Sequence, residues 1–260
     1  MRKVKTERWY GAVHEKTIYS LPDSARNPAR YEPEKMPRDR FDSEEEYEKF
    51  KVGISRRNHY RRLMANFSTT SLYSTLTFNT EWEIHTFTDA KIIRRRLIRA
   101  LKRKYPDAVI FLYMGRGRAT KRIHFHMVSE GVPAEFITSK WKYGEIVDID
   151  PLREHNYYDK IDHGADYQGL ANYLFDHWTE EVGGHRWFQT KNAKEPDKDE
   201  PVELEEDEVY TEENPPEAPN GYKLVETKAS SYGYILFKYV VIPPKDPRRS
   251  AGKKDRPRAG

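Results

Sequence analysis

The sequence predicts an α+β sandwich, with helices packed on one face of a mainly antiparallel central sheet. First, the expected elements of the central region follow one another in the order β-α-β-β-α-β-α. Second, residues 72–80 (LYSTLTFNT) are rich in β-branched and aromatic residues and alternate apolar with polar, which is typical of a strand with one polar face. Third, residues 108–114 (AVIFLYM) are almost continuously apolar, which indicates a strand inside the sheet.

The remaining elements follow from periodicity and from start and stop signals. Ser43, followed by glutamates, marks the beginning of a helix over 43–65. A second helix, over 87–106, has an apolar stripe and ends at Pro106. The other expected elements are strands at 122–128 and 144–150, helices at 133–141 and 165–178, and two strands after residue 220.

Composition divides the chain into five parts. They are an extended or disordered N-terminal arm (1–45), a core domain (46–192), an acidic flexible insert (193–220), strands that return to the core (221–244) and a basic disordered tail (245–260). The insert is most simply a spacer, although a DNA mimic or a polymerase-recruiting segment has the same composition. Because residues 195–217 hold twelve acidic residues and one lysine, the rest of a chain of net charge +4 is strongly basic. That imbalance favours a polyanionic partner, while the plainer alternative is a merely soluble surface.

Composition also excludes several classes of protein. There is no cysteine, so a disulfide framework and a thiolate zinc site are excluded. The N-terminus lacks the apolar stretch of a signal peptide, and no run approaches the roughly 18 apolar residues of a membrane span. We therefore expect a soluble intracellular protein without a membrane partner.

Two histidines lie one residue apart in the expected strand RIHFHMV. Because side chains alternate along a strand, Ile123, Phe125 and Met127 would face the helices, and His124 and His126 would lie side by side on the open face. Two imidazoles at that spacing can bind one divalent cation if a third group completes the site. The alternative is two exposed strand histidines with no metal.

The expected helix at 165–178 carries a tyrosine that is off its apolar stripe. At about 100° per residue, Tyr173 points to another side of the helix than Leu170 and Leu174, together with Asp166 and, one turn later, His177. Surface packing would explain such a tyrosine. The alternative is a nucleophile, which at a pKa near 10 needs help from a metal or a base.

These features together resemble the motifs of HUH endonucleases, and more narrowly the single-tyrosine rolling-circle replication initiators (Rep proteins) of bacterial plasmids and single-stranded DNA phages. The likeness lies in the strand with Leu76-Thr77-Phe78, in GRATKRIHFHMV, in WKYGEIVDID and in LANYLFDHW, and it covers about 70–192. It implies an HUH fold, which is ferredoxin-like and RRM-like, in the cytoplasm of a bacterial host.

The resemblance implies that Tyr173 attacks a phosphodiester of single-stranded origin DNA, forming a 5′-phosphotyrosyl link and a free 3′-hydroxyl, and later rejoins strands. His124 and His126 would hold Mn²⁺ or Mg²⁺; zinc is the alternative from the ligand types alone. A host helicase and a DNA polymerase would be partners, since the sequence has no P-loop motif of its own.

Two positions depart from the family pattern. The strand before the histidines has no acidic residue, so the third metal ligand is open between Asp166 and His177, with His163 and Glu130 as weaker candidates. The lysine that the family carries three residues after the tyrosine is replaced by Asp176. Either His177 takes over part of the role of that lysine, as a second catalytic candidate, or the protein works without that cation.

Candidate DNA contacts are threonines and cations near these motifs. Lysine and arginine attract the phosphate backbone in a salt-dependent way that is largely blind to sequence. The candidates are Thr75, Thr77, Arg116, Arg118, Lys121, Arg122, Arg186 and Lys191. Two other functions compete with a nickase: a non-catalytic nucleic-acid-binding domain of the same fold, and a metal-dependent phosphodiesterase that uses water.

Overall fold

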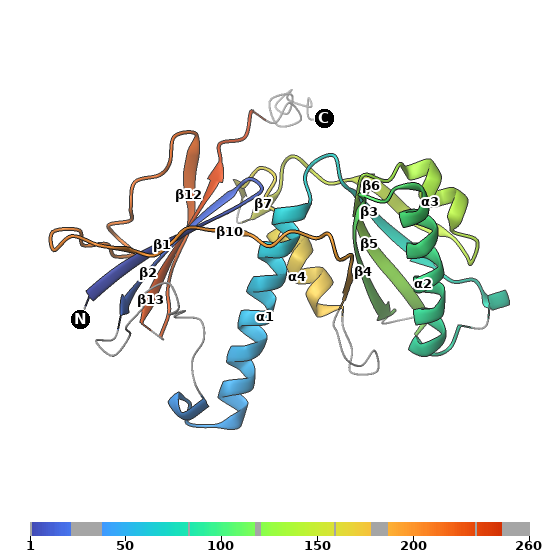
Figure 1. The fold of residues 1–260 in the computed structure, drawn as a ribbon, viewed down its shortest axis with the longest axis horizontal. Helices are drawn as coiled ribbons and strands as arrows, with labels where there is room; N and C mark the ends of the chain where they lie inside the picture. Colours follow the sequence, from blue (N-terminus) through green and yellow to red (C-terminus); the bar gives the residue numbers. More distant parts are fainter. Residues whose placement is uncertain are drawn as a thin grey trace, which may run out of the picture.

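The computed structural model describes residues 2–21, 38–82, 84–117, 121–158, 160–177, 187–231 and 233–245. In these residues the chain forms two large antiparallel sheets with helices between and beside them, as Figure 1 shows. The predicted α+β class with antiparallel sheets is confirmed. None of the helices in the described ranges combines the length and apolar character that crossing a membrane requires.

The first sheet has five strands in the order β6-β3-β5-β4-β9, and all its pairs are antiparallel. Its elements are β3 (Leu72–Thr77), α2 (Phe87–Lys104), β4 (Val109–Arg116), β5 (Ile123–Glu130), α3 (Ala134–Lys140), β6 (Ile146–Pro151) and β9 (Phe188–Gln189). The first six form the β-α-β-β-α-β motif of ferredoxin-like domains. This arrangement makes the histidine strand β5 the middle strand of the sheet.

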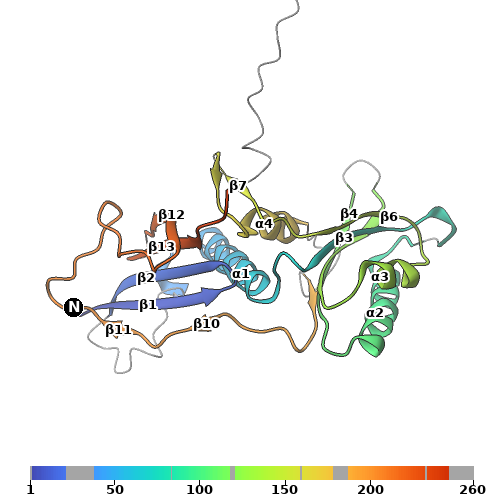
Figure 2. The ribbon, with the colours of Figure 1, turned by 90° about the horizontal axis from the view of Figure 1, so that it is seen from above.

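Helices cover both faces of this sheet, which corrects the expectation of helices on one face. On one face, α2 and α3 pack against Leu76, Phe125 and Met127. On the other face lie α1 (Glu44–Asn66) and α4 (Gln168–Asp176), whose apolar residues contact Phe111 and Val128. Figures 1 and 2 show α1 and α4 between the two sheets. The second face was expected to be open because the second sheet, which lies on the other side of α1 and α4, is built from distant parts of the chain.

The second sheet has the order β10-β1-β2-β13-β12, with β11 also paired to β1. Its strands are β1 (Arg2–Tyr10), β2 (Val13–Leu21), β10 (Asp197–Lys198), β11 (Val202–Glu203), β12 (Tyr222–Ala229) and β13 (Tyr234–Val241). The N-terminal arm was predicted to be extended or disordered over 1–45, and its residues 2–21 are extended, as two paired strands of this sheet. The inward face of β1 and β2 includes a buried charge, because Glu15 of β2 forms a buried ion pair with Arg61 of α1. A charged residue at an inward position interrupts the alternation of apolar and polar residues by which a strand is recognised.

Two other expected segments, the C-terminal strands and parts of the acidic insert, also belong to this second sheet. The two strands expected after residue 220 are β12 and β13, which form a hairpin, and β13 pairs with β2 of the second sheet and not with the central sheet. Parts of the acidic insert run along β1, where Lys198 pairs with Arg8 and Glu203 with Val4, so this stretch is not simply a free loop. Residues 246–260 of the predicted tail lie outside the described residues.

The described residues also form several short elements. α1 begins as predicted, since the Ser43 side chain accepts a hydrogen bond from the Glu46 amide. A small hairpin, β7 (Tyr157–Tyr158) and β8 (Ile161–Asp162), precedes α4, and two 3₁₀ turns lie at Arg38–Arg40 and Thr80–Trp82.

Candidate metal centre

The histidine strand β5 presents its side chains as the alternation predicted. Ile123, Phe125 and Met127 are buried under α2 and α3. His124 and His126 lie on the opposite face, where α4 covers them. His126 is buried and His124 is half-buried. The pair therefore lies in a partly dry site between β5 and α4.

Helix α4 brings Tyr173 and His177 to this pair. The Tyr173 hydroxyl lies 3.0 Å from Nε2 of His126, and Nε2 of His177 lies 2.6 Å from Nε2 of His124. Residues four apart share one side of a helix, so a single contact of α4 with the sheet delivers both groups. Tyr173 is 49% exposed, so a large substrate can still reach its hydroxyl.

Three histidines form a group that could hold a metal ion. One ligand atom from each of His124, His126 and His177 lies within 4.8 Å of the others. Neutral imidazole is the form that binds metals, and burial favours it here. Burial lowers the pKa of His126 to about 3, with further lowering by His177 and His124. Burial also lowers the pKa of His124. At neutral pH both rings are therefore unprotonated and ready to act as ligands.

Polar groups on β3 orient the His126 ring. Its Nδ1 lies 2.6 Å from the Tyr73 hydroxyl and 3.2 Å from Oγ1 of Thr75. Holding one ring nitrogen in this way leaves the other free to face Tyr173, which is how second-layer groups usually set a metal ligand. Thr75 was predicted at the site, whereas Tyr73 was missed. The same period-two pattern that selected Thr75 and Thr77 would have found it.

The Tyr173 phenol is not an activated nucleophile by itself. Burial raises its pKa, a hydrogen bond with Tyr73 acts in the opposite direction, and the charge of Asp148 raises it further. The phenol is therefore protonated at neutral pH and needs an electrophile beside it to react. Asp148, on β6, is a second residue of the site that the sequence reasoning missed.

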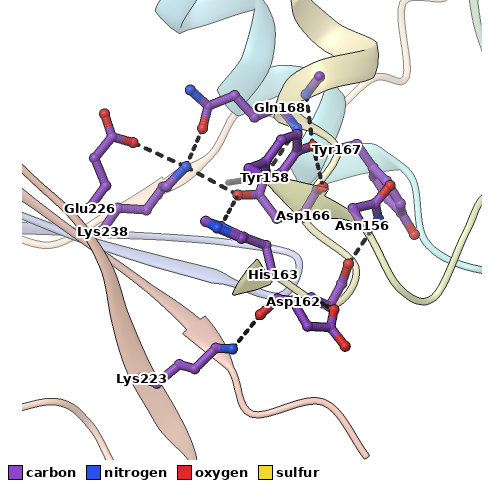
Figure 3. Close-up of polar contacts among 12 residues, drawn as sticks. Asn156, Tyr158, Asp162, His163, Asp166, Tyr167, Gln168, Lys223, Glu226 and Lys238 are labelled. Carbon is purple, nitrogen blue, oxygen red and sulfur yellow. Dashed lines mark hydrogen bonds and ion pairs between the residues drawn. The ribbon is translucent and has the colours of Figure 1, made fainter. Parts of the chain in front are cut away.

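Asp166, one of the two main candidates for the third ligand, lies in a different cluster. It is fully buried and accepts a 2.7 Å hydrogen bond from the Tyr60 hydroxyl. Lys238 of β13 also binds it, at 3.1 Å, as Figure 3 shows. His163 lies 3.9 Å from Asp166, and Glu130 is bound by Ser71 and Thr70 at the far end of β5. His177 is the candidate that the structure brings to the histidine pair.

The structure also shows the surroundings of Asp176, the residue at the position where HUH endonucleases carry a lysine. Asp176 forms an ion pair with Arg56 of α1, whose Nη1 donates to it at 2.9 Å. The guanidinium also lies over the Phe175 ring, 4.7 Å from its centroid. A cation is thus present beside this turn of α4, but it comes from α1 and is partly neutralised by Asp176.

The predicted DNA contacts are spread around the cluster. Thr77 donates a 3.1 Å hydrogen bond to the Glu145 carbonyl, and Arg116 donates to the carbonyls of Lys121 and His85. Thr77, Arg122 and His124 line a cavity of about 360 Å³, which borders the cluster at His124. Lys121 and Lys191 are exposed, and Arg118 and Arg186 lie outside the described residues.

No family model and no curated protein matches the sequence, and no solved structure matches the fold. The protein is thus an α+β protein with a three-histidine cluster beside a half-exposed tyrosine.

Proposed function

We propose that this protein nicks and rejoins single-stranded DNA through Tyr173, as a rolling-circle replication initiator of the HUH type. The observation that carries the proposal is the 3.0 Å approach of the Tyr173 hydroxyl to His126, inside a group of three histidines. A half-exposed tyrosine lies next to three imidazoles, and burial keeps two of them, His124 and His126, unprotonated at neutral pH. This arrangement has the parts that a metal-assisted nucleophile requires.

The donor set fits a divalent transition metal. His124, His126 and His177 offer three imidazole nitrogens, which suit Mn²⁺ better than Mg²⁺, because Mg²⁺ prefers oxygen ligands. A cation held there would polarise the scissile phosphate and stabilise the negative charge that develops on it. Tyr73 and Thr75 would keep the His126 ring in its ligating orientation.

The chain's own residues account for the rest of the reaction. The Tyr173 oxygen attacks the phosphorus, a new P–O bond forms to the phenol, and the bond from phosphorus to the 3′-oxygen breaks. The phenol loses its proton and the leaving 3′-oxygen gains one, so the reaction consumes no other reagent. Attack by the 3′-hydroxyl on the phosphotyrosyl link reverses these changes and rejoins strands. A host helicase and polymerase would open the duplex and extend the free 3′-end.

The decisive experiment looks for the covalent adduct. The full-length protein is incubated with Mn²⁺ and a fluorescent single-stranded oligonucleotide library, and the products are separated under denaturing conditions. We expect a denaturant-resistant adduct, and mass spectrometry of its peptides should place the nucleotide on Tyr173.

Tyr73 provides the matched control, because it lies in the same site with its hydroxyl on the other nitrogen of His126. Tyr173→Phe should abolish the adduct, while Tyr73→Phe should lower the yield and leave the adduct on Tyr173. Cleavage without any adduct, or cleavage that persists in Tyr173→Phe, would show that water or another residue is the nucleophile. DNA binding without cleavage in the presence of metal would favour the non-catalytic binding domain.

A further inference from the structure

A second cavity opens on the side of Tyr173 that faces β6. It has a volume of about 440 Å³, within the range of small-ligand pockets. Its lining includes Tyr73, Asp148, Asp150, Tyr167, Leu170 and Tyr173. Because Tyr73 and Tyr173 also touch His126, the pocket and the histidine cluster share one wall.

The walls of this pocket suit a flat ring. Tyr73 comes from β3, Tyr173 and Leu170 come from α4, and Tyr167 stands at the N-terminal end of that helix. Aromatic faces bind unpaired bases by stacking, at a strength that depends little on which base is present. Stacking alone would therefore hold a base beside the nucleophile without selecting it.

Two of the charged groups of the pocket, Asp148 and Asp150, are carboxylates that can only accept hydrogen bonds. Strand β6 pairs with β3 so that Asp148 lies opposite Thr75 and Asp150 opposite Tyr73, which places both carboxylates on the face that carries the site. Two carboxylates repel a phosphate, whereas they accept hydrogen bonds from the amino groups of bases. Among the described residues of the lining, Arg153 is the one cation. The pocket is thus matched to the base of a nucleotide and poorly matched to its phosphate.

We infer that this pocket binds the base of a nucleotide next to the scissile phosphate, and that Asp148 selects bases with an exocyclic amino group over thymine. The inference rests on the proposed function for the identity of the substrate. Cytosine, adenine and guanine each offer an amino group to the carboxylate. Thymine instead turns carbonyl oxygens toward it on both sides of its single N–H.

The test compares oligonucleotides that differ only at the two nucleotides flanking the mapped cleavage position. With the wild-type protein, thymine at the position that enters the pocket should lower kcat/KM about tenfold relative to the best amino-bearing base. Asp148→Asn, whose amide can also donate, should bring that ratio close to one. Asp150→Asn applies the same test to the neighbouring carboxylate. Both aspartates are exposed, so neither variant is expected to unfold.

Glu135→Gln is the matched control, because Glu135 is an exposed acid of α3 on the opposite face of the sheet. It should leave both the rate and the base preference unchanged. A wild-type protein that cleaves equally well with thymine at either position would overturn the inference, as would an unaltered preference in both aspartate variants.

A second readout separates this inference from the nickase proposal. The same oligonucleotides are titrated into Tyr173→Phe, and binding is followed by fluorescence anisotropy. A preference for amino-bearing bases that depends on Asp148, in a protein that never forms an adduct, would uphold the pocket and refute the nuclease. Adduct formation without any base preference would uphold the nuclease and refute the pocket.

Discussion

The imidazole of His177 lies where the side chain of residue 115 would stand, and residue 115 is a glycine: a Cβ built there would overlap the ring. Gly115 lies on β4 directly opposite His124 of β5. The end of α4 can therefore approach the sheet closely enough for His177 to meet His124. The glycine makes room for the third histidine.

Gly115→Ala should displace His177 and weaken metal binding. The added methyl group cannot be accommodated without moving the ring, because the neighbouring backbone belongs to the middle of a sheet. We expect the Mn²⁺ dissociation constant, measured by isothermal titration calorimetry, to rise at least about tenfold, as is typical when the support of a ligand is lost. Gly53→Ala is the control, since a Cβ at this position of α1 meets nothing within 4 Å. It should leave metal binding unchanged and stabilise the protein by up to about 1 kcal/mol. Equal metal affinity in all three proteins would show that His177 is not a ligand.

Removing His177 itself should abolish stabilisation by metal. A ligand that binds only the folded state at 100 times its dissociation constant stabilises that state by about 2.7 kcal/mol. We expect the wild type to show a gain of that size with Mn²⁺ and His177→Ala to show almost none, as measured by urea unfolding with and without metal. His85→Ala, which removes an exposed histidine outside the cluster, should behave as the wild type. The prediction fails if chelation of metal affects His177→Ala and the wild type alike.

Lys238 and Asp166 should contribute strongly to stability. Both are buried, and they join β13 of the second sheet to the N-terminal end of α4, where Lys238 also binds Gln168 (Figure 3). Lys238→Met leaves the Asp166 carboxylate buried without its cation, which should lower the free energy of unfolding by about 3–5 kcal/mol. The double variant with Asp166→Asn should recover part of this loss, because the uncompensated charge is gone.

Lys228→Met is the control for this pair, since Lys228 is exposed on β12 of the same sheet. It should change the free energy of unfolding by less than about 0.5 kcal/mol. If Lys238→Met costs no more than Lys228→Met in urea unfolding, the second sheet does not hold α4 through this contact.

His59 should make the protein sensitive to acid. Burial, with a smaller contribution from Arg56, lowers the pKa of His59 to about 3, whereas an unfolded chain has the ordinary value of 6.5. Between these values the unfolded state takes up a proton that the folded state does not. Stability is therefore unaffected by this group above pH 6.5, and it falls below that by up to about 1.4 kcal/mol per pH unit.

The measurement is urea unfolding at pH 7 and pH 5 for the wild type and His59→Gln. From pH 7 to pH 5 the wild type should lose about 2 kcal/mol more than the variant, because glutamine does not titrate. The histidines of the metal cluster titrate in both proteins and cancel in this comparison. His85→Gln, which replaces an exposed histidine on another part of the chain, is the control and should keep the full loss. An identical loss in wild type and His59→Gln would mean that His59 can be protonated in the folded state.

Local periodicity in the sequence was sufficient to predict the α+β class, most of the central elements and two pairs of site residues, but not Tyr73 or Asp148. An alternation of two puts His124 and His126 on one face of a strand whatever that strand packs against, and a spacing of four does the same for Tyr173 and His177 on a helix. The structure retains both relationships.

Tertiary structure alone decided which of these groups meet. The sequence left Asp166 and His177 as equal candidates for the third ligand, because the group that binds Asp166 is Lys238, 72 residues away. The N-terminal strands of the second sheet escaped detection for a similar reason: Glu15 on their inward face is compatible with burial because Arg61 of α1 binds it, together with Arg8 and Tyr10. Charges that satisfy one another across the fold have no local signature, since their pairing depends on how distant segments pack and not on the spacing of residues along the chain.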